Sequence, residues 1–510
     1  AILAFLLAIP PTLLFIAILL VTAKHTIVLL RLFRKSKTLP LLPLNYGIGQ
    51  IGDAISRRDM FHRLLKYSRM KNLTDSTYVT TMFMYPMVTT SNPEYIKQIL
   101  ITGAQNFSKS SNTNENLTLF FGRGLVTSAG DLWKKQRSIL NQFFAPSVVD
   151  NLMDKMVYQI KNTLKVWNKG TGTFTMKNIQ ADISELTLRI VVGCVFGSDD
   201  STVSDIVTNY NSLCYVFMPI LIQASLSHSL LHVPIPVNKR YQKMKHNLNA
   251  YVNELITRKK KELTPDTLSC NSSKLDLMSM MLMSSRDVEG NVLMTEQQIS
   301  DECKTFLAAG HETTSSLISW VLYHLCIHDK VQDRVIDEID QLSSQLESSQ
   351  VPSYDQINSL SYMRSVMDES MRLFPPIMCL DKETVKDVRL GNHLIPKGTQ
   401  VSIDFVGLHR NEKIWKNADV FDPDRWQEER LRKEVPNYRN CFLPFSSGQR
   451  NCIGKIFTYT EAPLILYMIL KEYRVSFADG FDSSRALFFE TGAALRPEAL
   501  DITLTRREGI

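Results

Sequence analysis

Apolar residues recur every three or four positions through most of the middle of the chain. This spacing is typical of amphipathic helices, because about 3.6 residues complete one helical turn. It is clearest over residues 182–197, 241–263 and 299–328. These long periodic stretches predict that helices make up most of the structure.

Strand-like patterning is confined to two zones. Apolar and polar residues alternate over Ser76–Ser91 and again over Val385–Phe405, where Pro396, Lys397 and Gly398 predict a turn. The chain has no internal repeat and no glycine-rich phosphate-binding loop after either zone. The pattern therefore predicts one large, mainly α-helical domain with a small β-sheet region.

The first part of the chain follows a different pattern. Ala1–Ala23 contains no charged side chain, and about 20 apolar residues in a helix can cross a hydrocarbon layer of about 30 Å. The basic residues that follow would stay on the cytoplasmic face; they are Lys24, Arg31, Arg34, Lys35 and Lys37. We therefore predict a single transmembrane anchor over residues 1–23, a basic, proline-bearing linker over 24–45 and a cytoplasmic domain over 46–510.

A cleaved signal peptide is the alternative interpretation of the first residues. It is disfavoured because the basic residues follow the apolar run and no small-residue cleavage site ends it. The later apolar run Cys214–Leu226 is too short to cross a membrane, and its length favours a shallow contact with the membrane interface.

Charge and cysteine content exclude several classes of function. The net charge is only +7 over 510 residues and the basic residues are scattered, which does not favour nucleic acid as a partner. The 8 cysteines include no C-x-x-C pair and no zinc-ligand spacing. So few cysteines indicate a reducing compartment without a disulfide framework.

One cysteine stands in an unusual setting near the C-terminal end. The segment PFSSGQRNCIG places Phe445, Gly448, Arg450, Cys452 and Gly454 in the pattern F-x-x-G-x-R-x-C-x-G. This pattern resembles the haem-binding loop of the cytochrome P450 superfamily, the haem-thiolate monooxygenases. The resemblance implies haem b as cofactor, Cys452 as the axial thiolate and only metal ligand, and Arg450 as a partner of a haem propionate. Phe445 and Gly448 would shape the loop against the cofactor, and N–H groups at the start of the following helix would favour the thiolate.

Further landmarks of the same family occur in order along the chain. The segment ESMR places Glu369 and Arg372 on one helical face, and FDPDRW supplies Arg425. The resemblance implies that these residues form a buried charge cluster with a structural role. Such a cluster is destabilising unless every partner is present.

Other basic residues are implied as partners of the haem propionates. The segment DLWKKQR places Trp133 and Arg137 four residues apart on a predicted helix, and the family's W-x-x-x-R pair meets a propionate. Lys382 is implied as a third partner, at a position where arginine is more usual. Lysine keeps the charge there but cannot form a bidentate contact.

The oxygen chemistry is implied for the segment AAGHETTSS. Gly310 would leave room over the cofactor in a locally widened helical turn. Thr313 would hydrogen-bond the dioxygen and Glu312 would supply protons, whereas His311 is expected to pack away from the haem. Ala309 stands where many fatty-acid ω-hydroxylases of the superfamily have a glutamate that esterifies the haem, so we expect no covalent attachment.

One departure from the family pattern concerns the helix after Cys452. Pro463 lies inside this helix, where proline is expected to kink it or to end its first segment.

The resemblance covers roughly residues 40–510 and implies a membrane-bound, microsomal monooxygenase. The enzyme would insert one oxygen atom from O2 into a lipophilic substrate, which could be a fatty acid, sterol, terpenoid or xenobiotic. Its electrons would come from NADPH through a separate NADPH–cytochrome P450 reductase, with cytochrome b5 as a further candidate donor. It would be a single-pass protein of the endoplasmic reticulum membrane with its catalytic domain in the cytoplasm.

Two alternatives remain open on the sequence. One is an oxygen-independent haem-thiolate isomerase or dehydratase of peroxides, and Glu312 and Thr313 argue against it because such enzymes commonly lack this acid–alcohol pair. The other is a haem sensor or carrier without turnover. The segments implied to line the substrate pocket are apolar and leave the substrate open; they are residues 106–123, 214–231, 306–313 and 377–380.

Overall fold

The computed structural model describes residues 57–507, apart from 70–74, 83–84, 168–171, most positions from 198 to 227, 264–274, 287–288, 348–349 and 488–493. The predicted anchor over residues 1–23 and the linker over 24–45 lie outside the described residues. Within the described part of the chain, no helix is both long and apolar enough to cross a membrane.

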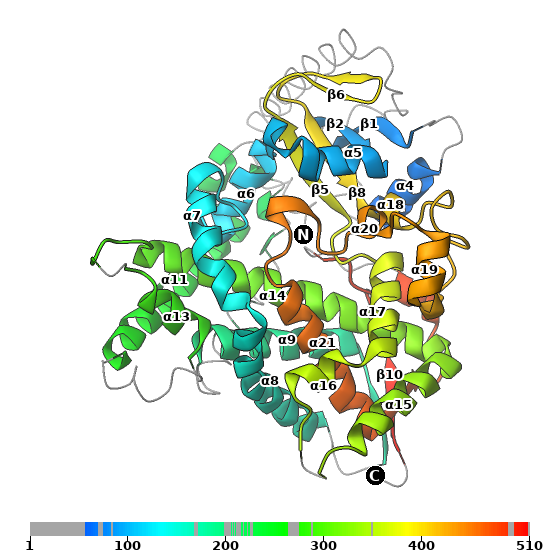
Figure 1. The fold of residues 1–510 in the computed structure, drawn as a ribbon. Coiled ribbons are helices and arrows are strands. Elements are labelled where there is room, and N and C mark those ends of the chain that lie inside the picture. The colour runs from blue at the N-terminus through cyan, green and yellow to red at the C-terminus, as the bar shows by residue number, and fades with distance from the viewer. Residues whose placement is uncertain are drawn as a thin grey trace.

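Long helices form the larger part of the molecule, as predicted. α14 (Glu296–Ile327) crosses the centre, and α9 (Ile179–Phe196) packs along it (Figure 1). α8 (Pro146–Trp167) and α21 (Lys455–Glu472) complete this central layer, and α11 (Pro236–Glu262) lies on one side of it. The periodic stretches over 182–197, 241–263 and 299–328 therefore correspond to α9, α11 and α14.

Shorter helices surround this layer. They are α4 (Arg57–Ser68), α5 (Pro93–Lys97), α6 (Ser111–Phe121), α7 (Gly130–Asn141), α13 (Leu277–Met283), α15 (Asp329–Ser343), α16 (Tyr354–Asn358), α17 (Ser361–Leu373), α18 (Phe405–His409), α19 (Glu428–Glu434) and α20 (Tyr438–Cys441).

α14 is held at its start by a capping box. The Gln298 N–H donates to the Thr295 hydroxyl at 3.2 Å, and the Thr295 N–H donates to the Gln298 side chain at 2.7 Å. From there α14 continues as α-helix for 32 residues. The expected widened turn at Gly310 is therefore wrong.

α21 also continues without a break, through Pro463. Proline has no N–H, so one helical hydrogen bond is missing at this position. Ala462, Leu464 and Ile465 around it are fully buried, and this packing keeps the residues helical. Pro463 does not end the first segment of the helix, contrary to one of the expected outcomes.

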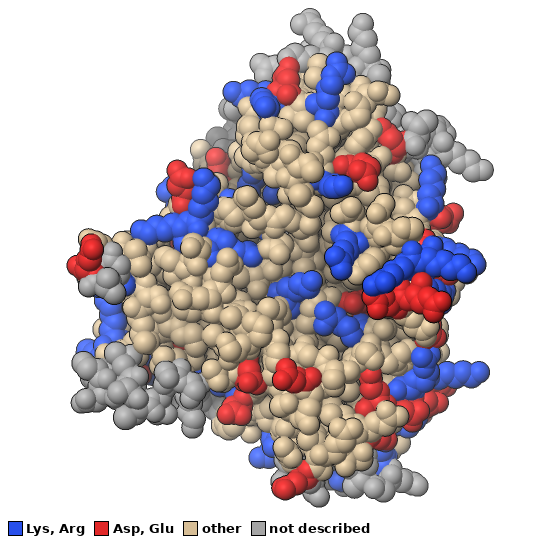
Figure 2. All heavy atoms as spheres, in the orientation of Figure 1, with Lys and Arg blue, Asp and Glu red and all other residues tan. Residues whose placement is uncertain are grey.

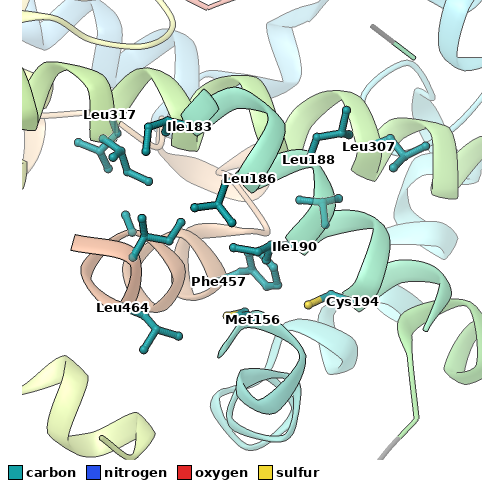
Figure 3. Packing of buried hydrophobic residues seen from close by; sticks show 14 of the residues in the cluster. Met156, Ile183, Leu186, Leu188, Ile190, Cys194, Leu307, Leu317, Phe457 and Leu464 are labelled. Carbon is teal, nitrogen blue, oxygen red and sulfur yellow. The ribbon is translucent and has the colours of Figure 1, made fainter. Parts of the chain in front are cut away.

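The main core forms where α9 meets its neighbours. Figure 3 shows Ile190 of α9 close to Phe457 of α21, with Met156 of α8 nearby and Leu307 of α14 on the other side. Ile190, Met156 and Leu307 are wholly buried, and each such side chain contributes about 1.5–3 kcal/mol relative to exposure. α9 is therefore fixed against α14, the helix that carries the predicted oxygen-activating residues.

A mixed β-sheet lies beside the helices, and three of its strands contribute residues to the cavity described below. Its order is β1-β2-β8-β5-β3, in which β2 and β8 pair in parallel and the other neighbours are antiparallel. The strands are β1 (Thr77–Met82), β2 (Tyr85–Thr90), β3 (Phe107–Lys109), β5 (Cys379–Thr384) and β8 (Gln400–Asp404).

Two smaller sheets complete the described strands. One has the order β4-β10-β9 and the other is the hairpin β6-β7. Their bounds are β4 (Thr173–Met176), β6 (Val388–Leu390), β7 (His393–Ile395), β9 (Tyr473–Phe477) and β10 (Ile502–Arg506). Both predicted strand zones are confirmed, whereas β3, β4, β5, β9 and β10 were not predicted because each is too short for its pattern to stand out in the sequence.

Candidate active site

A cavity of about 650 Å³ lies between α14, α6, α7, β5 and the loop that carries Cys452. Its wall is mostly apolar and includes residues from each segment expected to line it, together with others from α9 and from the chain between α6 and α7. Phe217 and Leu221 of the apolar run 214–226 line this cavity, and Val216 and Ile220 are buried. Val216 and Ile220 therefore pack in the protein interior, and the expected contact of this run with the membrane interface stays a prediction.

The Cys452 loop is a strained turn that only certain residues allow. Gly448 has φ +76°, and a side chain there would collide with the Leu100 carbonyl. Ser446 has φ +59°, also in the left-handed region. The Cys452 N–H donates to the Phe445 carbonyl at 2.9 Å, which closes the loop just before α21. The loop thereby presents Phe445 and the Cys452 sulfur to the cavity.

The Cys452 thiol lies deep in the protein but is open to the cavity. Burial raises the pKa of this thiol, whereas the Gly454 N–H and the charges of Arg137 and Lys455 act to lower it. These groups favour the thiolate, and a metal ion that coordinates the sulfur would complete its deprotonation.

Cationic side chains gather at one end of the cavity. The Arg450 guanidinium lies 4.1 Å from the Trp133 ring centre and donates to the Ser128 carbonyl at 3.1 Å. Arg137, on α7 with Trp133, donates to the carbonyl and the side-chain oxygen of Asn451 at 2.8 and 2.9 Å. The structure therefore brings Trp133, Arg137 and Arg450 together beside the Cys452 loop.

Two lysines on adjacent strands join this cationic end. Lys382 on β5 is paired in register with Lys109 on β3. Burial and the charge of Arg450 lower the pKa of Lys382 to about 8 and that of Lys109 to about 6, and Lys382 itself adds to the effect on Lys109. The sequence did not identify Lys109 as a site residue, because no motif surrounds it. Only the pairing of β3 with β5 brings it to this end of the cavity.

The predicted oxygen-activating residues lie on different sides of α14. Thr313 lines the cavity, and its hydroxyl donates to the Ala309 carbonyl at 2.8 Å. Glu312 is buried outside the cavity wall, where it accepts a hydrogen bond from the Ala494 N–H at 3.3 Å. His311 is buried against the ring of Tyr210, so it packs away from the cavity.

Gly310 lines the cavity with its backbone, but its missing side chain serves another contact. A Cβ at Gly310 would lie 2.9 Å from a methyl group of Val191 on α9. The glycine is therefore needed for close packing of α9 on α14, and its expected role of leaving room over a cofactor stays a prediction.

Glu369, Arg372 and Arg425 form a wholly buried cluster behind the cavity. Arg372 donates to both carboxylate oxygens of Glu369 at 2.8 Å, and Arg425 donates to Glu369 at 3.3 Å. Trp426 adds a bond to the same carboxylate at 3.1 Å. The remaining guanidinium N–H groups donate to the carbonyls of His409, Ala418 and Val420 for Arg372, and of Lys416 and Asn417 for Arg425.

The end of the cavity near Cys452 suits a flat ligand that carries both carboxylate groups and a sulfur-binding metal ion. In the described part of the chain, Lys109, Arg137, Lys382 and Arg450 form no ion pair, and the hydrogen bonds of Lys109, Arg137 and Arg450 go to backbone carbonyls and Asn451. Partly buried cations of this kind call for an anionic partner. Beside them, the Cys452 sulfur faces an apolar space. These residues fit a haem with its propionates at the cationic end.

Comparisons with known proteins agree with this geometry. The family model described as Cytochrome P450 matches residues 39–504. Human "Cytochrome P450 4F2" is 28% identical over 406 residues, 76% of each chain, and "Cytokinin hydroxylase" of Arabidopsis thaliana is 29% identical over 78% of this chain and 75% of its own. The haem domain in "Crystal structure of cytochrome P450DA heme domain" has a TM-score of 0.77 at 22% identity, over 92% of this chain and 98% of that chain.

Proposed function

Because the chain belongs to the cytochrome P450 family, it is a haem monooxygenase with a cysteine thiolate as axial ligand, and we propose that Cys452 supplies this thiolate. A member of this family uses dioxygen, a lipophilic substrate and a redox partner. The observation that carries the assignment is the thiol of Cys452, open to the cavity beside cationic side chains that form no ion pair in the described structure. The haem, when bound, supplies the activation of dioxygen.

The protein's own residues hold the haem at two places. Cys452 would bind the iron, with Phe445 and the Gly448 turn fixing the loop that carries it. Arg450, Arg137, Lys382 and Lys109 would bind the propionates, while Trp133 orients Arg450 through its ring. A propionate would also restore the charged form of Lys109, whose pKa is now about 6, because an opposite charge favours ionisation.

Thr313 and Glu312 would control protons on the oxygen side. The Thr313 hydroxyl already donates to the Ala309 carbonyl, so its oxygen can accept a hydrogen bond from a water molecule in the cavity. Glu312, held outside the cavity wall by the Ala494 N–H, would take protons from the protein exterior and pass them toward Thr313. This division of roles favours a monooxygenase over an oxygen-independent isomerase of peroxides.

Thr313→Val should uncouple electron use from product formation. The replacement has nearly the same shape but no hydroxyl, so haem binding should stay unchanged while proton transfer loses its controlled path. We expect product per NADPH to fall by roughly tenfold or more, with a matching rise in hydrogen peroxide. Product, NADPH and peroxide are measured together.

Two further variants control this experiment. Thr314→Val changes the next residue, which is buried away from the cavity, and should leave the coupling unchanged. Thr313→Ser restores a hydroxyl and should restore most of the coupling. Tight coupling in Thr313→Val, or equal uncoupling in Thr314→Val, would contradict the role given to Thr313.

We propose NADPH–cytochrome P450 reductase as the redox partner, with the contact on the face of the Cys452 loop. Figure 2 shows lysine and arginine side chains in the middle of this face, and the exposed Lys134, Lys135, Arg439 and Lys455 lie on α7, on α20 and at the start of α21. Complementary charge would steer an acidic partner to this face. The proposed location is the endoplasmic reticulum membrane, with the domain in the cytoplasm.

The proposed activity is the insertion of one oxygen atom into a lipophilic substrate. The test is to combine the full-length holoenzyme with reductase, NADPH and a panel of fatty acids, sterols, terpenoids and foreign compounds. We expect substrate-dependent NADPH oxidation and a product one oxygen atom heavier than the substrate. A haem carrier or sensor would give neither, and a peroxide isomerase would act without the reductase.

A further inference from the structure

An acidic side chain, Asp381, lies on the otherwise largely apolar wall of the cavity. It stands on β5 between Leu380 and Lys382, and all three residues line the cavity. An acidic group on such a wall is costly unless a partner compensates for the lost water. Binding of a haem propionate would explain the presence of Lys382, but it gives Asp381 no role.

The carboxylate of Asp381 is only partly satisfied by protein groups. Its Oδ1 accepts a hydrogen bond from the hydroxyl of Ser402, its partner on β8, at 2.8 Å. Its Oδ2 lies 3.5 Å from the Thr113 hydroxyl, at the limit of a hydrogen bond. A carboxylate can accept about four hydrogen bonds, so Asp381 keeps the capacity to accept another on its cavity side.

No basic side chain compensates for this carboxylate within the described residues. The structure gives Asp381 no ion pair, and burial raises its pKa, while the bonds from Ser402 and Thr113 act to lower it. The group that best completes such a site is an uncharged hydrogen-bond donor, because bringing an ammonium ion into an apolar cavity costs more. A ligand carboxylate would instead meet like charge.

We propose that Asp381 accepts a hydrogen bond from a hydroxyl group of the substrate, so the enzyme selects lipophilic alcohols over matched ethers and carboxylates. This inference deepens the proposed function and rests on it, because the cavity must be the substrate site. The cationic residues beside it do not offer a site for a fatty-acid carboxylate, since Lys109 and Lys382 are assigned to the haem propionates. Asp381 therefore sets which end group the cavity accepts.

The test measures binding to the full-length holoenzyme by equilibrium dialysis. The probes are 1-dodecanol, its isomer 1-methoxyundecane, which lacks the donor hydrogen, and dodecanoate. The wild-type protein should bind the alcohol roughly tenfold more tightly than either of the others. Equal binding of the alcohol and the ether would overturn the proposal.

Two replacements of Asp381 separate its acceptor from its charge. Asp381→Leu should bring the alcohol-to-ether ratio to about one, because no acceptor remains. Asp381→Asn keeps a carbonyl acceptor without the charge, so it should retain most of the preference for alcohol over ether while binding dodecanoate more tightly. A preference for the alcohol over the ether that persists in Asp381→Leu would contradict the proposal. If that variant does not fold, the proposal is contradicted when Asp381→Asn binds dodecanoate no more tightly than the wild type does.

Glu383→Gln is the matched control, because Glu383 lies two residues along β5 and also holds α6. Its carboxylate accepts hydrogen bonds from the Ser111 N–H and hydroxyl at 3.0 and 2.6 Å, but it does not line the cavity. The Glu383→Gln protein should bind all three probes as the wild type does. If Glu383→Gln lowers the preference as much as Asp381→Leu, α6 placement is the cause and the proposal is wrong.

Failure of this inference and of the proposed function are distinguishable. Dialysis needs no turnover, so alcohol selectivity is measured even if no oxygen is inserted. Oxygen insertion without alcohol selectivity would overturn the role of Asp381 alone. Alcohol selectivity without reductase-dependent oxygen insertion would support Asp381 and overturn the monooxygenase assignment of the cavity.

Discussion

Cys452→Ser should abolish the strongly red-shifted Soret band of the reduced, carbon-monoxide-bound protein and reduce product formation to background. A serine hydroxyl is a far weaker acid than a thiol, and its oxygen is a harder ligand atom than sulfur. It therefore cannot take the place of a soft, deprotonated sulfur ligand. The loop around it should survive, because its closing bond comes from the backbone N–H of residue 452 to the Phe445 carbonyl. The measurement is the difference spectrum, with haem content determined in parallel.

Other thiols of the same cavity provide the matched control. Cys194 and Cys379 also line it, on α9 and β5. Cys379→Ser and Cys194→Ser should therefore keep the red-shifted band at full strength. Persistence of the band in Cys452→Ser, with its loss in either control, would assign the thiolate to a different cysteine.

Glu369→Gln is expected to cause the largest loss of stability. The replacement keeps the shape but leaves Arg372 without its counter-charge and Arg425 with only Glu434, at 3.9 Å, although both arginines lie at 0% exposure. Removing one partner of a buried ion pair costs about 3–5 kcal/mol, and here one carboxylate serves two guanidinium groups. The midpoint of urea unfolding, followed through the haem absorbance, should fall markedly.

Glu185→Gln is the control for this prediction. Glu185 pairs with Arg189 one turn away on the surface of α9, with its side chain 48% exposed, so its loss should change stability by about 0.5 kcal/mol or less. If Glu369→Gln shifts the midpoint no more than Glu185→Gln does, the buried cluster does not hold the fold behind the cavity.

The residues that sequence motifs predicted share one property. Their roles depend on short, fixed spacings, such as the three-residue step from Glu369 to Arg372 on α17 or the loop around Cys452. Spacing of this kind fixes which side chains share a helical face or a turn. Lys109 shows the limit, because it reaches the site only through the pairing of β3 with β5, and no local pattern encodes that pairing.

Neighbouring residues on α14 show a second limit. Adjacent helical residues point about 100° apart, so neighbours such as Glu312 and Thr313 can have different surroundings. The motif named both residues, but only the structure shows that Thr313 lines the cavity while Glu312 contacts Ala494. For Gly310 the motif gave the residue but not its contact with Val191, because that contact comes from a helix distant in the sequence.

The most direct test of the account is the source of the inserted oxygen. The holoenzyme is given reductase, NADPH and a substrate found in the panel, under dioxygen labelled with a heavy isotope and in ordinary water. We expect one labelled oxygen atom in the product, and none when the label is placed in the water instead. Product that forms without dioxygen, or that carries its new oxygen from water, would contradict the assignment of this cavity as a monooxygenase site.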